Sequence, residues 1–275
     1  MERRNYSAEV IQSIKNEKIK NFARLQGSRE RKKQNLFIVE GEREVERAMR
    51  AGYKFSHLFY CPEILGPEFL KTIRETMEEA VIFNEVTREV YNHITYRKNS
   101  EGITGWGIRR SHSLHDLKLR KNPLLLVLER VEKPGNLGGV LRTADAAGLD
   151  AVIICDPQTD IYNPNVVRSS LGAVFTVPIG MATSPETIIW LKAHHISILC
   201  TSLTAPIPYT LMNFSVPSAI VMGTEATGLS TTWLKASDRN IIIPMQGKVD
   251  SMNVSVSAGI VIFEALRQRS IKSKK

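Results

Sequence analysis

The chain has 275 residues, of which 43% are hydrophobic and 24% are charged, and its formal net charge is +9 at pH 7. This length is sufficient for two domains with sizeable cores, and this composition excludes a disordered or fibrous protein. The positive charge predicts binding to a polyanion, with nucleic acid as the first expectation.

The three cysteines, Cys61, Cys155 and Cys200, are far apart and show no paired spacing. This argues against a disulfide framework and a zinc site, and it fits a reducing compartment. No apolar stretch of signal-peptide length follows the first residues, and the runs LLLVL and AVIIC are too short to span a bilayer. We therefore expect a cytoplasmic protein with no metal site and no membrane association.

The first part of the chain predicts a small α/β domain over residues 1–106. A basic helical segment precedes the short strand LFIVE. The next segment, EREVERAMRAG, places Val45 and Ala48 on one helical face and ends at Gly52, a residue type that favours a helix C-terminus. HLFYC and AVIFN predict two further short strands separated by helical sequence.

A polar and basic stretch over residues 107–121 predicts a linker, because it shows no apolar period. The second domain is predicted over residues 122–275. Its strands are continuously apolar: LLLVLE, AVIIC, SILCTS, SAIVMG and NIIIPM. Such strands, separated by helical segments, predict an α/β domain with a parallel sheet that helices cover on both faces.

The stretch PGNLGGVLRTADAAG follows the first of these apolar strands and looks at first like a nucleotide-binding turn. A dinucleotide fingerprint needs G-x-G-x-x-G, but Asn136 stands where the second glycine would be. No Gly-Lys-Ser/Thr follows, so a P-loop is excluded as well. Arg142 is expected in a helix that starts after the glycines, either as a surface arginine or as a functional residue.

Two later stretches favour the functional interpretation. IVMGTEATGLS places Glu225 in a glycine-flanked turn after an apolar strand, where open α/β sheets bind ligands. IIIPMQGKVDSMNVSVSAGIVIFEAL places Ser251 and Asn253 at the start of a long helix, whose free backbone N–H groups suit an electron-rich group. Taken separately, Glu225 could be a solvated acid, Ser251 a helix cap and Asn253 a turn residue.

In this order the three stretches resemble the three motifs of the SpoU (TrmH) family of RNA ribose methyltransferases. The matching segments are Asn136 to Arg142, Gly223 to Ser230 and Ile243 to Val256. The resemblance implies a SPOUT α/β fold whose C-terminal parallel-sheet domain forms a deep trefoil knot, an exception to the rule that chains do not knot. It also implies S-adenosylmethionine as cofactor and a homodimer formed through the knotted domain.

The resemblance further assigns roles to individual residues. The set that would act at the ribose 2′-hydroxyl comprises Asn136, Arg142, Glu225, Ser251 and Asn253. The set that would line the cofactor pocket comprises Gly223, Ile243 and Met252. Arg142 would orient the hydroxyl and stabilise developing negative charge, because a guanidinium with a pKa of about 12.5–13.8 is a poor base. No metal is needed, because the leaving sulfide is neutral.

The segment IKNFARLQGSRERKKQNLFIVEGEREVERA resembles the ribosomal-protein-like RNA-binding domain that often accompanies this family. Its positive charge predicts salt-dependent RNA contacts with little sequence information, although a solvated helical face would look similar. The cations of this predicted surface are Lys18, Lys20, Arg24, Arg29, Arg31, Lys32 and Lys33. Weaker candidates are Arg97, Lys98, Arg109 and Arg110.

Some positions depart from the family pattern. Relatives often carry Asp-Pro before the motif asparagine, whereas this chain has Lys133 before Pro134, which leaves the target nucleotide open. Met252 and Ser257 stand where Leu and Ala are usual, and Met for Leu conserves volume.

The favoured function is S-adenosylmethionine-dependent methylation of a ribose 2′-hydroxyl, with large-subunit ribosomal RNA as the expected substrate. Transfer RNA is the alternative substrate within the enzyme class. A non-catalytic RNA-binding or ribosome-assembly factor that retains the fold is the alternative from another class. The five intact residues of the predicted catalytic set argue against that factor, since a binding module needs no such set.

Overall fold

The structure, a computed structural model, describes residues 10–77, 80–96, 101–224, 226–249 and 251–272. The chain divides into two compact units. Unit 1 comprises residues 1–110 and 162–175, and unit 2 comprises residues 111–161 and 176–275.

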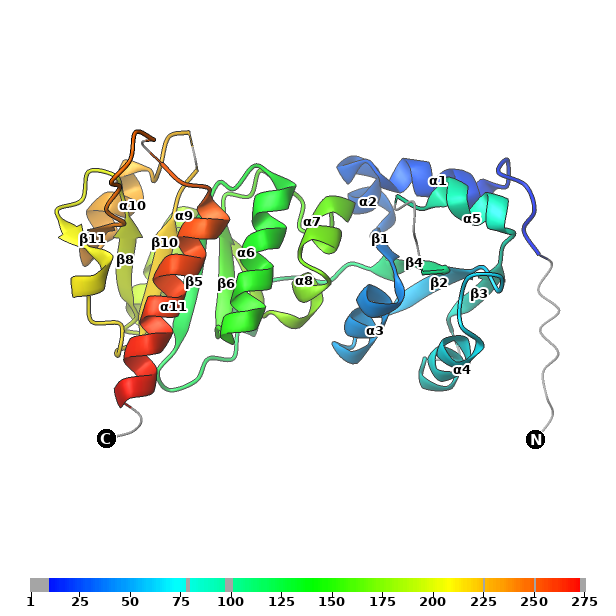
Figure 1. Cartoon of the computed structure of the whole chain (residues 1–275), viewed down its shortest axis with the longest axis horizontal. Helices are drawn as coiled ribbons and strands as arrows, with labels where there is room; N and C mark the ends of the chain where they lie inside the picture. The colour runs from blue at the N-terminus through cyan, green and yellow to red at the C-terminus, as the bar shows by residue number, and fades with distance from the viewer. Residues whose placement is uncertain (1–9, 78–79, 97–100, 225, 250, 273–275) are drawn as a thin grey trace. The chain divides into compact units, whose positions relative to one another are not determined.

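Unit 1 is built on a sheet with strand order β1-β4-β2-β3 (Figure 1). Strand β4 runs antiparallel to β1 and β2, whereas β2 and β3 are parallel. The elements of its N-terminal segment are α1 (Glu17–Leu25), α2 (Ser28–Gln34), β1 (Leu36–Glu40), α3 (Glu42–Arg50), β2 (Phe55–Tyr60), α4 (Pro67–Thr76), β3 (Ile82–Glu85), α5 (Arg88–Ile94) and β4 (Ile103–Ile108).

Helix α3 follows its predicted pattern. Val45 and Ala48 are fully buried, as the helical spacing predicted. Gly52 adopts a left-handed φ of 73° and donates its N–H to the Met49 carbonyl, so the predicted helix ending is confirmed.

Strand β4 was not predicted, because its sequence ITGWGI is rich in glycine, which weakens strand propensity. Tertiary packing explains both glycines. An added Cβ at Gly105 would lie 2.6 Å from Leu58 Cδ2, and one at Gly107 would lie 2.5 Å from Phe37 Cζ. The neighbouring side chains occupy the space that a larger residue would need, so glycine is required in the centre of this sheet.

Unit 2 is built on a parallel sheet with strand order β7-β6-β5-β10-β8-β11-β9, which confirms the predicted fold class. The predicted apolar strands correspond to β5, β6, β8, β10 and β11, whereas the short β7 and β9 were missed. The elements are η1 (Leu114–Asp116), β5 (Leu124–Glu129), α6 (Pro134–Ala147), β6 (Ala151–Cys155), β7 (Ile179–Ala182), α9 (Ser184–Ala193), β8 (Ser197–Thr201), β9 (Ile207–Pro208), η2 (Tyr209–Leu211), β10 (Ser218–Met222), α10 (Thr231–Ala236), β11 (Arg239–Ile242) and α11 (Val254–Lys272).

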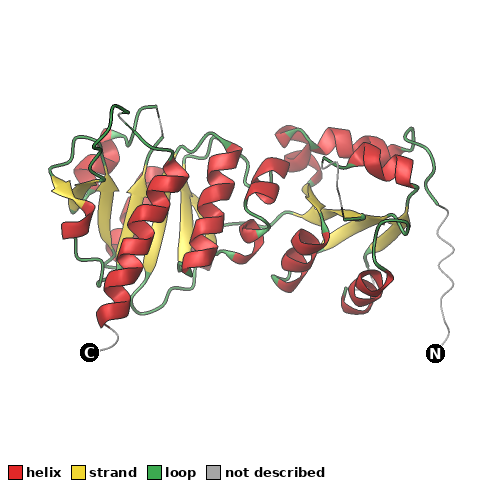
Figure 2. Cartoon of the chain, in the orientation of Figure 1, coloured by secondary structure: helices red, strands yellow, loops and turns green. Residues whose placement is uncertain are grey.

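Helices lie on both faces of the unit 2 sheet (Figure 2). Alternate residues of β5, β6, β8 and β10 form a buried cluster with Leu191 of α9 and Trp233 of α10. On the other face, α6 contacts β6, α11 contacts β10, and the two helices pack side by side (Figure 1). Leu114, which falls in the predicted linker, is buried in the same cluster as Leu191 and Trp233.

Helix α6 begins earlier than predicted. It starts at Pro134 rather than after the glycines, so Gly135, Gly138 and Gly139 lie inside the helix. Proline suits the first helical position, because its missing N–H would have no intrahelical partner there. The glycine-rich stretch is therefore the first turns of a helix and not a phosphate-cradling loop.

Residues 162–175 follow β6 in the chain but group with unit 1. They contain α7 (Pro164–Ser169) and most of α8 (Ala173–Thr176). Tyr162 stacks on Phe37 of β1 with ring centroids 4.3 Å apart, and Arg47 of α3 donates to the Leu171 carbonyl at 2.9 Å.

Candidate functional site

A cavity of about 420 Å³ opens at the carboxyl ends of β8, β10 and β11 in unit 2. Its lining includes the segment that precedes α11 and the start of that helix. The predicted cofactor residues Gly223, Ile243 and Met252 all line this cavity, and so does Ser251 of the predicted catalytic set. This volume lies within the usual range for small-molecule and cofactor sites.

The loop after β10 forms one wall of the cavity and has little freedom at its base. Thr224 and Gly228 exchange backbone hydrogen bonds of 3.2 and 3.0 Å. An added Cβ at Gly223 would lie 2.2 Å from the carbonyl carbon and oxygen of Gly228. Gly223 is therefore required for this close approach. Glu225 of the predicted catalytic set lies outside the described residues.

A side-chain hydrogen bond joins the first and third motifs. Asn253 Nδ2 donates to Asn136 Oδ1 at 3.0 Å, although the two residues are 117 positions apart in the chain. Asn253 Oδ1 accepts from the backbone N–H of Ser255 at 2.9 Å and thereby caps the first turn of α11. Asn253, rather than Ser251, is the capping residue of this helix.

Small residues allow α6 and α11 to approach closely. An added Cβ at Gly139 would lie 3.2 Å from Ser255 Cβ, and one at Gly259 would lie 3.8 Å from Thr143 Cγ2. Arg142 lies on α6 between Gly139 and Thr143 in sequence, and its side chain is exposed. It forms no hydrogen bond or ion pair with another described residue.

The chemistry of the cavity fits S-adenosylmethionine. Apolar side chains such as Met222, Leu229 and Ile243 suit an adenine ring. Hydroxyl and backbone groups of the three strand ends suit the ribose hydroxyls and the amino-acid group. An added Cβ at Gly223 would clash with the Gly228 backbone, so glycine is needed for this loop to take the conformation that lines the cavity.

Part of the lining was missed from the sequence. Thr201, Ser202 and Thr204 line the cavity from the end of β8. The available signal was their position at and just beyond the end of the apolar strand SILCT, similar to the position of Gly223 after β10. Ligands of open α/β sheets bind at such strand ends.

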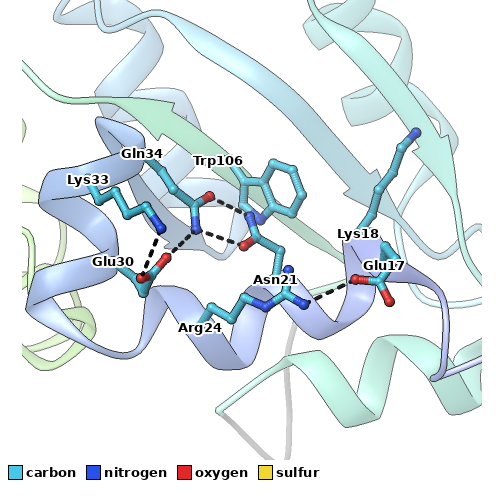
Figure 3. Close-up of a pocket in the computed structure, with 8 residues that line it drawn as sticks. All are labelled: Glu17, Lys18, Asn21, Arg24, Glu30, Lys33, Gln34 and Trp106. Carbon is cyan, nitrogen blue, oxygen red and sulfur yellow. Dashed lines mark hydrogen bonds and ion pairs between the residues drawn. The ribbon is translucent and has the colours of Figure 1, made fainter.

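Three cations of the predicted RNA-binding surface, Lys18, Arg24 and Lys33, line an open depression of about 760 Å³ beside α1, α2 and Trp106 (Figure 3). Asn21 and Gln34 exchange amide hydrogen bonds of 2.9 and 3.0 Å within it. Glu17 pairs with Lys20 at 2.8 Å and with Arg24 at 3.1 Å.

The other cations of this surface differ in their pairing. Lys33 lies 4.0 Å from Glu30. Arg29 and Lys32 are exposed and form no ion pair within the part of the chain that the structure describes. Lys18 donates to Asn84 Oδ1 at 2.7 Å, so its ammonium is held by the unit 1 sheet.

Arg31 was predicted to belong to the RNA-binding surface, but the structure places its side chain in the interior. Its side chain is only 1% exposed, and its guanidinium donates to the Leu25 and Gln26 carbonyls at 2.8 and 2.7 Å. Those carbonyls end α1 and would otherwise lack partners. Arg31 therefore ties α1 to α2 and does not present its charge to RNA.

The weaker RNA-binding candidates are also placed. Arg109 lies over the Tyr162 ring at 4.9 Å, and Arg110 lies over the Tyr53 ring at 4.0 Å, so both make cation–π contacts within unit 1. Arg97 and Lys98 lie outside the described residues.

All three cysteines are buried and free. Burial raises the pKa of Cys155 and of Cys200 to about 12, so neither is a thiolate nucleophile at neutral pH. Within the described ranges, no group of His, Cys, Asp and Glu side chains could hold a metal ion. Among the same residues, no helix combines the length and apolar character needed to cross a membrane.

Comparison with known proteins identifies both halves of the chain. The SpoU rRNA Methylase family matches residues 123–263, and the MRM3-like substrate binding domain matches residues 16–105. The 23S rRNA (guanosine(2553)-2′-O)-methyltransferase RlmP of Bacillus subtilis is 32% identical over 92% of this chain and 97% of its own length. The 23S rRNA (uridine(2479)-2′-O)-methyltransferase of Streptomyces viridochromogenes is 27% identical over 93% of this chain and 91% of its own length.

Solved structures show the same fold. The AdoMet-bound rRNA methyltransferase from Sinorhizobium meliloti is 30% identical, with a TM-score of 0.86 over 94% of this chain and 98% of that one. The SpoU methyltransferase AviRb from Streptomyces viridochromogenes, in complex with AdoMet, is 25% identical, with a TM-score of 0.85 over 93% and 98% of the two chains. The chain therefore belongs to the SpoU rRNA Methylase family.

Proposed function

We propose that this protein transfers a methyl group from S-adenosylmethionine to a ribose 2′-hydroxyl of large-subunit ribosomal RNA. The observation that carries the proposal is the convergence of three sequence motifs in unit 2. Gly223, Ile243 and Met252 line one cavity. The hydrogen bond from Asn253 to Asn136 connects the cavity-lining segment to the helix that carries Arg142.

The cofactor site is assigned to the backbone and apolar side chains of the cavity. Bound there, S-adenosylmethionine supplies a methyl group on a positively charged sulfur, which leaves as a neutral thioether. At the base of the loop after β10, the Thr224–Gly228 backbone hydrogen bonds and the close approach of Gly223 to Gly228 shape this wall of the cavity. Ser251 and Asn253 complete the pocket by hydrogen bonds.

The role of binding and orienting the ribose 2′-hydroxyl is assigned to Arg142. An exposed guanidinium presents several N–H donors to a 2′-oxygen and to a neighbouring phosphate, and it stabilises negative charge as that oxygen loses its proton to water. Asn136 would fix the ribose beside it, and Glu225 would complete the set. Alignment of the hydroxyl with the methyl group contributes on the order of 7–11 kcal/mol in favourable cases.

Two observations support ribosomal RNA as the substrate: the substrates of the relatives and the domain that unit 1 resembles. The relatives named above are methyltransferases of 23S rRNA. The match of residues 16–105 to a substrate-binding domain supports RNA contact through the exposed residues Lys20, Arg24, Arg29, Lys32 and Lys33.

The proposal includes three features of the intact protein. Unit 2 is proposed to contain the trefoil knot implied by the family resemblance. Two chains are proposed to pair through unit 2, where Val256 and Phe263 of α11 are 51% and 52% exposed. A cytoplasmic site of action follows from the proposed ribosomal RNA substrate.

Radiolabelled methyl transfer tests the function. Purified protein, tritiated S-adenosylmethionine and separate pools of large-subunit ribosomal RNA and transfer RNA should give label in the ribosomal pool at one alkali-resistant ribose. Label in transfer RNA alone would overturn the substrate, and cofactor binding without transfer to either pool would overturn the stated substrates. Absence of cofactor binding would favour an RNA-binding factor.

A further inference from the structure

A buried carboxylate lies beneath the wall of the cavity and has no role in the mechanism above. Glu129 is the last residue of β5 and is only 3% exposed. Its Oε2 accepts a hydrogen bond from the backbone N–H of Ser230 at 2.7 Å. Ser230 ends the loop that begins at Gly223, and most of that loop lines the cavity. Glu129 therefore holds the C-terminal end of the 223–230 loop, which forms one wall of the cavity.

This hydrogen bond connects two parts of the site that the chain keeps apart. After Glu129 the backbone turns through Arg130, which has a left-handed φ of 54°, and reaches α6 with Asn136 and Arg142. The side chain of Glu129 turns instead to the loop after β10. One residue thus positions the cavity wall relative to the helix that carries the proposed catalytic arginine.

The side chain of Ser230 provides no substitute for this contact. Ser230 precedes α10, but its hydroxyl makes no capping hydrogen bond. Its Oγ is buried without a partner among the described residues. The contact from the backbone N–H to the carboxylate is therefore the anchor that joins this end of the loop to β5, and a buried carboxylate is costly unless such donors satisfy it.

We propose that Glu129 is a positioning residue that sets the geometry of the S-adenosylmethionine pocket by anchoring the 223–230 loop at Ser230. The inference rests on the proposed function, because it concerns the same cavity. It assigns no contact between Glu129 and cofactor or RNA.

The test compares two buried carboxylates of unit 2. Asp150 is 6% exposed and accepts the backbone N–H of Leu124 at 2.8 Å, at the opposite end of β5. Glu129→Ala and Asp150→Ala each leave a buried N–H without its acceptor, so both should lower Tm. Only Glu129→Ala should raise the Kd for S-adenosylmethionine, by about tenfold or more, in calorimetry on the full chain.

Two further variants separate positioning from simple loss of stability. Glu129→Gln keeps an oxygen acceptor, so its Kd for S-adenosylmethionine should stay within about threefold of the wild type. Ser230→Pro removes the N–H donor at a residue whose φ of −66° suits proline, and it should reproduce the effect of Glu129→Ala. It serves as the test if Glu129→Ala does not fold.

Each outcome decides between the proposals. Wild-type cofactor affinity in folded Glu129→Ala, or in Ser230→Pro, would overturn the positioning role. Equal loss of affinity in Asp150→Ala would overturn it as well, since general destabilisation would then explain the effect. A wild-type protein that neither binds S-adenosylmethionine nor transfers its methyl group would instead overturn the proposed function.

Discussion

Substitution of Arg142 can distinguish methyl transfer from cofactor binding. Arg142 is exposed on α6, and no described residue pairs with it. Arg142→Ala should lower the single-turnover rate of methyl transfer by about 10²- to 10³-fold, since one charge-stabilising donor is lost at the reacting oxygen. Cofactor Kd should be unchanged, and stability should change by less than about 0.5 kcal/mol, as is usual for exposed sites.

Arg142→Lys is the matched variant. It keeps the charge but loses the planar fork of donors, so an intermediate rate is expected. A normal rate in Arg142→Ala would remove the arginine from the mechanism.

Asp150 provides a pH-dependent test of stability. Burial alone raises the pKa of this carboxyl, but hydrogen bonds from Arg120 and from the Leu124 N–H outweigh it, and the net pKa is lowered. A lowered pKa stabilises the fold above the unfolded-state value of about 3.9, and the contribution is lost as pH falls through the folded-state value. Asp150→Asn should therefore cost about 1–3 kcal/mol at pH 7.

The difference between Asp150→Asn and the wild type should shrink as the pH falls below about 4, where the wild-type carboxyl becomes protonated. Urea unfolding at pH 7 and at successively lower pH values measures this. A difference that is independent of pH would mean that shape, and not charge, is what Asp150 contributes.

At the scale of elements, the close packing of α6 on α11 holds the first motif against the third. Gly139→Leu should separate the helices, because even an added Cβ would lie 3.2 Å from Ser255 Cβ. We expect a loss of about 1–3 kcal/mol, as in overpacked cores, and weaker cofactor binding because the Asn253–Asn136 hydrogen bond is disturbed.

Gly135→Leu is the control within the same helix. An added Cβ at Gly135 meets no atom within 4 Å, so the larger side chain has open space. Thermal unfolding of both variants measures the effect. Equal destabilisation would show that helix packing at Gly139 is not the cause.

At the scale of the whole molecule, RNA affinity should depend on salt through unit 1. The logarithm of the RNA association constant falls linearly with the logarithm of the salt concentration. Arg29→Ala or Lys32→Ala removes one phosphate contact and should make this slope less steep by about 0.7–0.9. Arg50→Ala is the control, because Arg50 is also exposed in unit 1 but pairs with Glu46 at 2.6 Å on α3. Filter binding at several salt concentrations distinguishes them, and an equal slope change in Arg50→Ala would point to a general charge effect.

The exposed face of α11 provides a test of the proposed dimer. Val256 and Phe263 are seven residues apart and share a helical face, so both are available to a second chain. Light scattering should give twice the 30.9 kDa chain mass for the wild type and a single chain mass for Phe263→Glu. Ile189→Glu, at a 69% exposed position of α9, should leave the mass unchanged. A monomeric wild type would contradict the proposed dimer.

Features that depend on local pattern could be predicted from the sequence. The apolar runs LLLVLE and AVIIC coincide with β5 and β6, because a strand buried on both faces needs apolar residues at successive positions. The helix that begins near Asn253 was also predicted correctly, because a helix cap acts on residues within one turn of it. The order and spacing of the three motifs were sufficient to indicate the family.

Contacts between distant residues could be known only from the folded chain. The sequence cannot show that Asn253 donates to Asn136, because 117 residues separate them and the contact depends on how two helices pack. It predicted Arg31 as an exposed cation, but the carbonyl end of α1 draws that guanidinium inside. It gave no sign that Glu129 reaches Ser230, since a carboxylate in an apolar strand is recognised as an anchor only when its donor is seen. Local pattern determines elements, whereas the site depends on contacts between segments that are distant in the chain.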